Sequence, residues 1–124
     1  MALLDNIRRG KHFKKGSLIS TSTNTSGAWM SPEGMHPFSI TVSGDFSATS
    51  VVVTIYVDDG DSQPSDADAN HATLKVFTIT APQAAPPAFT LDAPFEWIKA
   101  VTTSYAGTQP VTVNFEASEA NSRY

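Results

Sequence analysis

The stretch FSITVSGDFSATSVVVTIYV, residues 38–57, decides the fold class of this chain. Its first part alternates apolar residues with Ser and Thr, which is the period of a strand with one buried face. The pair Gly44-Asp45 then predicts a turn. Residues 51–57 are almost continuously apolar, which predicts a central strand that is covered on both faces or buried in an oligomer.

Sequence patterns typical of β-strands also occur before and after this stretch. Further strands are predicted at residues 73–80, 88–91, 97–105 and 111–115, the last two as a closing hairpin, and residues 17–30 as an edge strand or an extended connection. Pro82, Pro86 and Pro87 cannot donate ladder hydrogen bonds, so they should carry the chain from one sheet to another. We expect an all-β fold, an antiparallel two-sheet β-sandwich of the jelly-roll type.

The first fifteen residues carry most of the positive charge. Five of the eight basic residues lie there beside one acid, so this segment is +4, whereas the remainder holds three basic residues against eleven acids and is −8. We therefore predict a basic N-terminal arm at residues 1–16, extended or with a short helix, and a single β-sandwich domain at residues 17–124. Removal of residues 1–15 should leave the fold nearly intact, because the predicted core strands lie elsewhere.

The arm is the segment that we expect to bind a partner. Its candidate residues are Arg8, Arg9, Lys11, Phe13, Lys14 and Lys15. Nucleic acid is disfavoured as that partner, because the acidic body repels phosphate and the arm offers few aromatic side chains for stacking. We expect the arm to meet an acidic groove on a neighbouring protein instead.

Several kinds of chemistry are excluded or weakly supported by the composition. The chain has no Cys, which excludes disulfides and thiolate sites. No apolar run approaches the ~18 residues of a membrane span, so we expect no membrane partner. The three His have no metal-ligand spacing and no G-x-S-x-G motif is present, so we expect no enzyme, no catalytic residues and no cofactor.

The Asp-rich segment at residues 58–70 resembles the start of a calcium loop. Asp66, Asp68 and Asn70 reproduce its first D-x-D-x-N pattern. His71 stands where an EF-hand needs Gly, and Phe77 where it needs a bidentate Glu. We expect a solvated hairpin tip without a specific cation, and Asp66 and Asp68 remain the weak candidates for a metal site.

Two tryptophans are the largest apolar side chains. Trp97 lies in a predicted strand, and we expect it in the core. Trp29 lies beside Met30 in a stretch with Gly and Pro, which leaves two alternatives. The pair is either a surface anchor for a partner or a sugar, or part of a loop packed over one end of the sandwich.

Two stretches resemble a known group of proteins. The first is PFSITVSG, residues 37–44, continuing through Phe46 to residues 48–51, and the second is FEWIKAV, residues 95–101, followed by Tyr105, Gly107 and residues 111–113. Together they resemble small β-sandwich virion proteins of tailed bacteriophages, which occur among capsid decoration, head and tail components. The resemblance spans about residues 30–116.

This resemblance implies a structural role in the virion, reached after synthesis in the bacterial host cytoplasm. We expect a capsid decoration or cement protein that self-associates as a homo-oligomer and binds the major capsid protein or other virion subunits. The alternatives are a carbohydrate- or receptor-binding module of a tail fibre, or another head or tail component. An exposed row of aromatic side chains on one sheet face would favour the carbohydrate-binding alternative.

Overall fold

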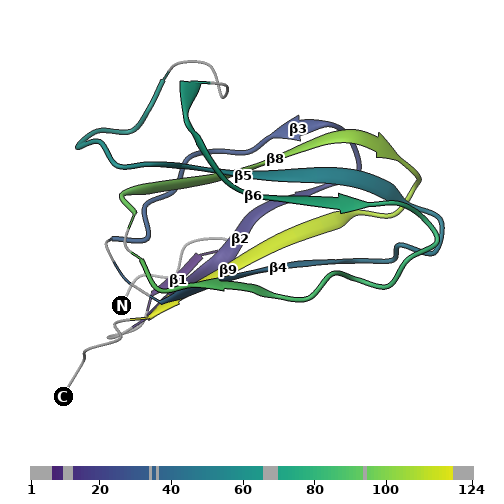
Figure 1. Ribbon diagram of the computed structural model, residues 1–124, viewed down its shortest axis with the longest axis horizontal. Helices are drawn as coiled ribbons and strands as arrows, with labels where there is room; N and C mark the ends of the chain where they lie inside the picture. The colour runs from purple at the N-terminus through teal and green to yellow at the C-terminus, as the bar shows by residue number, and fades with distance from the viewer. Residues whose placement is uncertain are drawn as a thin grey trace.

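Two antiparallel β-sheets face each other in the computed structural model (Figure 1). The structure describes residues 7–9, 13–33, 35, 37–65, 70–93 and 95–118. Within these residues the secondary structure is strand, with no helix, and hence no helix that could cross a membrane. The predicted all-β, two-sheet β-sandwich is therefore confirmed.

The first sheet has five strands in the order β1-β2-β9-β4-β7. Its strands are β1 (Ile7–Arg9), β2 (Phe13–Thr21), β4 (Phe38–Gly44), β7 (Phe89–Leu91) and β9 (Val111–Ser118). The second sheet has four strands in the order β3-β8-β5-β6. Its strands are β3 (Thr25–Ser26), β5 (Ser50–Asp58), β6 (Ala72–Ile79) and β8 (Trp97–Ala106).

The core lies between the sheets and follows the alternation of their strands. In β4, Phe38, Ile40 and Val42 are buried, as their spacing predicts. In β5 every second residue from Val51 to Val57 is buried, and the strand lies between β8 and β6. The central position of this strand is thus confirmed. The residues of its outer face are only half-buried, so this chain alone does not cover both faces, and burial in an oligomer stays a prediction.

The predicted basic arm is partly built into the first sheet. β1 pairs with β2, and β2 pairs with β9 along its whole length, from Phe13 opposite Ser118 to Thr21 opposite Val111. The expected boundary after residue 16 therefore falls inside β2. A register shift between Ser17 and Ile19 lets two consecutive side chains, Leu18 and Ile19, both be buried.

Six connections between consecutive strands pass from one sheet to the other, and two of them bear on the predictions. The proline-rich segment leads from β6 to β7, as predicted (Figure 1). The closing hairpin is wrong, because β8 and β9 belong to different sheets. Gly107 lies in their connection, where an added Cβ would be 2.6 Å from Thr49 Oγ1, so the close approach of the chain at this point requires glycine.

Candidate interaction surfaces

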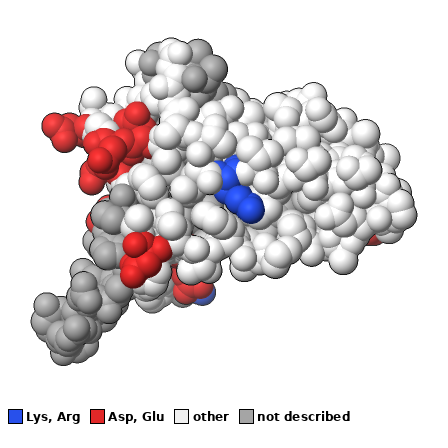
Figure 2. Space-filling view, viewed as in Figure 1, with Lys and Arg blue, Asp and Glu red and all other residues white. Residues whose placement is uncertain are grey.

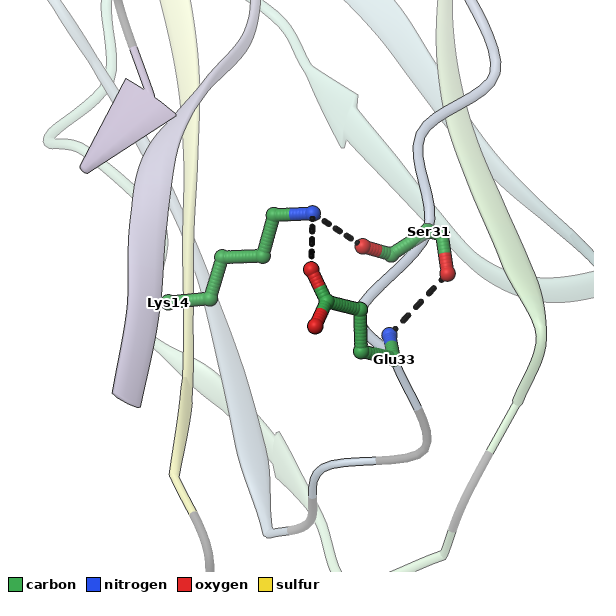
Figure 3. Close-up of polar contacts among 3 residues, drawn as sticks. All are labelled: Lys14, Ser31 and Glu33. Carbon is green, nitrogen blue, oxygen red and sulfur yellow. Dashed lines mark hydrogen bonds and ion pairs between the residues drawn. The ribbon is translucent and has the colours of Figure 1, made fainter. Parts of the chain in front are cut away.

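Lys14 holds a loop of its own chain (Figure 3). Its Nζ donates to the carbonyl oxygen of Ser31 at 2.6 Å and lies 3.1 Å from Glu33 Oε2. The Ser31 hydroxyl in turn accepts from the Glu33 amide at 3.0 Å. Only 13% of the Lys14 side chain is exposed, so this predicted partner-binding residue is engaged in fixing residues 31–33 against β2.

The other described residues of the predicted binding segment lie at the corner formed by β1 and β2. Phe13 and Lys15 alternate with Lys14, and the Lys15 ammonium lies 5.8 Å from the centroid of the Phe13 ring. The register places Arg8 opposite Lys15 and Arg9 opposite Lys14. We name these four cationic positions the basic hairpin; Lys11 lies outside the described residues.

Met30 is part of the sheet rather than a projecting side chain. It exchanges two backbone hydrogen bonds with Ile98 of β8, at 2.9 and 2.8 Å, and packs against the core. Trp29 is half-buried, and its ring meets the edge of the His71 ring at 5.0 Å between centroids. The Lys99 ammonium lies 5.4 Å from the Trp29 ring centroid.

Trp97 does not lie in the core, so that prediction is wrong. The inward residues of β8 are Ile98, Ala100 and Thr102, which puts Trp97 on the outer face of the second sheet, half-buried. Its Nε1 donates to the carbonyl oxygen of Gly60 at 3.2 Å. The indole therefore tethers the loop after β5 instead of filling the space between the sheets.

A polar cluster that no sequence pattern predicts lies on this outer face. His71 Nδ1 lies 3.0 Å from Asp58 Oδ1, and its side chain is only 7% exposed. Lys99 is 7% exposed on the neighbouring strand. The Trp29 ring contacts both the His71 ring and the Lys99 ammonium. We name these residues the tryptophan cluster: Trp29, Asp58, His71 and Lys99. Spacing could not reveal it, because the four residues come from separate segments.

Acidic side chains gather at one end of the molecule, where the loop after β5 lies (Figure 2). Asp66 and Asp68, the weak metal candidates, lie outside the described residues. Among the residues that are described, no group of three or more His, Asp and Glu side chains could hold a metal ion.

A groove runs between β6 and the proline-rich connection. Its volume is about 210 Å³, and its lining includes Lys75, Val76, Phe77, Pro86, Pro87 and Phe89. The Lys75 ammonium lies 5.7 Å from the centroid of the Phe77 ring and 5.5 Å from that of Phe89. Sequence reasoning missed this groove, because its two walls are about ten residues apart and meet only in the folded chain.

No protein-family model and no curated protein matches this chain. Among solved structures, the chain is similar to the SPBc2 prophage-derived protein YomS, with a TM-score of 0.56 and 13% sequence identity. The likeness covers 94% of this chain and 98% of the other. At this identity the comparison shows a shared fold over almost the whole of both chains.

Proposed function

We propose that this chain is a structural protein of a bacteriophage particle, of the capsid decoration or cement type, that binds neighbouring virion subunits. The observation that carries the proposal is the nearly full-length likeness of its fold to a prophage-derived protein. The likeness spans the two sheets of the sandwich without a large insertion in either chain. Such a domain suits a role in which the surface binds and no catalytic centre is needed.

The basic hairpin supports a binding role for the first sheet. Arg8 stands opposite Lys15 and Arg9 opposite Lys14 in the ladder. Like charges directly opposite each other in a sheet are unfavourable. For the four cations, the described residues place two carboxylates nearby: Glu33 beside Lys14, and Glu116 of β9 opposite Lys15. Carboxylates of a partner would lower the free energy of this corner, so we expect it to face an acidic surface of a virion subunit.

The proposed partners are the major capsid protein or another virion subunit, together with further copies of this chain. Excess negative charge over the remainder of the sequence opposes binding to nucleic acid. The proposal includes no catalytic activity and no cofactor.

Cosedimentation with particles of the encoding phage that lack this protein tests the proposal. The full-length protein should bind them, and binding should weaken as salt rises. Replacing Arg8 and Arg9 by Gln should reduce binding at least tenfold. The matched control replaces Thr108 and Gln109, in the exposed β8–β9 connection, by Glu, which changes the net charge equally. Equal loss in both variants, or no binding by the wild type, contradicts the proposal.

A second candidate function has one observation in its favour. Trp29, Tyr56 and Trp97 are all half-buried, and Tyr56 and Trp97 lie on the outer face of the second sheet. Aromatic side chains on a sheet face are typical of sugar-binding modules, so a carbohydrate- or receptor-binding module of a tail fibre is the alternative. A glycan array with Trp29→Ala as control tests it, and binding to particles but to no glycan would refute it.

A further inference from the structure

The outer edge of β6 has no strand partner among the described residues. β6 is the last strand of its sheet and runs for eight residues, Ala72–Ile79. The segment that follows it lies alongside the groove, but Pro86 and Pro87 have no N–H with which to pair. The backbone groups on this edge are therefore open to a strand from another chain.

The side chains at this edge also favour binding. Val76, at 46%, is the one large apolar side chain that is exposed in the described part of the chain. The groove beside it is lined by the rings of Phe77 and Phe89 and by prolines. In Figure 2 the wide surface beyond the acidic end of the molecule is uncharged except for a basic patch in its middle. Few charges around an apolar centre are typical of the core of a protein interface.

Lys75 indicates the chemistry of the partner. Its ammonium lies over two aromatic rings, and no described carboxylate forms an ion pair with it. Covering this cation with apolar atoms alone would be unfavourable. A segment that binds the groove should therefore place a carboxylate beside Lys75.

A second copy of this chain fits the edge poorly. Antiparallel pairing of β6 with itself about Val76 would place the two Lys75 side chains diagonally across the ladder. No acid of β6 would separate them, because the strand reads ATLKVFTI. A lysine on an edge strand is a common device against pairing between copies.

We propose that the outer edge of β6 and its groove bind an extended segment of a different protein. That segment adds a strand to the second sheet, places apolar side chains over Val76 and into the groove, and pairs an Asp or Glu with Lys75. This is strand addition, in which backbone hydrogen bonds give affinity and alternate side chains give specificity. The proposal goes beyond the proposed function, since it does not require that the partner be a virion subunit.

Selection from a displayed library of random twelve-residue peptides tests this inference without using particles. The enriched peptides should combine alternating apolar residues with an Asp or Glu. They should bind Lys75→Glu and Val76→Ser at least tenfold more weakly than wild type, and should slow amide exchange in β6. The double variant Thr108→Glu, Gln109→Glu, which makes the same change in net charge in the exposed β8–β9 connection, should bind them like wild type.

Three outcomes would overturn it. One is the absence of any enriched peptide, the second is enrichment of basic peptides, and the third is equal binding to wild type and Lys75→Glu. Both groove variants alter exposed side chains, so they should melt within about 2 °C of wild type, and loss of binding cannot then be ascribed to unfolding.

Discussion

Lys14 stabilises the fold through contacts that a free arm would lack. Lys14→Met keeps the apolar stem but removes the ammonium that Ser31 and Glu33 share. Because the carbonyl bond is partly buried, we expect a loss of about 1–2 kcal/mol in the free energy of unfolding. Lys15→Met is the control, and its effect should stay below about 0.5 kcal/mol. Denaturant unfolding measures both, and equal effects would contradict this role for Lys14.

Trp97 and Ile98 are neighbours with opposite orientations, so they form a matched pair. Ile98 is 2% exposed in the core, and Ile98→Ala should cost about 2–5 kcal/mol. Trp97→Ala removes a half-buried ring and one hydrogen bond to Gly60, so it should cost less, on the order of 1–2 kcal/mol. A larger loss for Trp97→Ala in denaturant unfolding would mean that the indole is part of the core after all.

The same pair shows what could not be predicted at this scale. The sequence WIKAVTTSYA of β8 predicts a strand, but it carries apolar residues in both alternate sets and so does not show which set faces inward. Trp97 is the largest residue, which favours its set for the core; yet Ile98, Ala100 and Thr102 face inward. The inward set is decided by the space between the sheets, and this depends on residues far away in the sequence.

Asp45 makes a small contribution to stability that depends on pH. The Ser47 hydroxyl donates to Asp45 Oδ1 at 2.7 Å and the Ser47 amide at 3.1 Å, and these bonds lower the pKa of Asp45 below its ordinary value of 3.8. A lowered pKa in the folded state stabilises the protein above pH 3.8, and this stabilisation is lost as the pH falls through the folded pKa.

Asp45→Asn tests this contribution, because the amide oxygen still accepts the two bonds but does not titrate. Wild type should be the more stable protein near neutral pH, and the difference should shrink as the pH falls below 3.8. Melting curves across this range measure it. A difference that is independent of pH would show that the bonds do not favour the ionised carboxylate.

At the scale of elements, β2 decides how much of the N-terminal segment the fold needs. A variant lacking residues 1–12 keeps all of β2, whereas one lacking residues 1–15 loses three rungs with β9 and the Lys14 contacts. We expect the shorter protein to be less stable than the longer by on the order of 2 kcal/mol. We therefore expect residues 13–15 to contribute to stability, in contrast to the expectation from the sequence that residues 1–15 are dispensable. Equal stability of the two variants would show that they do not contribute.

Most strands were predictable from the sequence, but their pairing was not. Alternation located β4 and a nearly continuous apolar run located β5. The pairing of β5 with β6 was expected from their closeness in the chain. β8 and β9 are also close, yet they separate into different sheets. Strand β2 carries lysines and glycine instead of an apolar run, and its pairing with β9 depends on a partner about 100 residues away.

At the scale of the whole molecule, the uneven distribution of charge could be predicted from the sequence, whereas the surface features formed by folding could not. The count of basic residues indicated the basic hairpin as a binding segment, although it could not show that Lys14 is engaged within the chain. The groove beside β6 and the tryptophan cluster depend on segments that meet only in the sandwich. Surfaces of this kind follow from topology, and no local pattern predicts them.

We propose that this chain is a structural protein of a phage particle. Electron cryomicroscopy of purified particles of the encoding phage tests it most directly. We expect ordered density for the sandwich at regular positions on the particle, with the β1–β2 corner against acidic residues of a neighbouring subunit. Particles that are complete and infectious but hold no copy of the chain, although infected cells make it, would contradict this structural role.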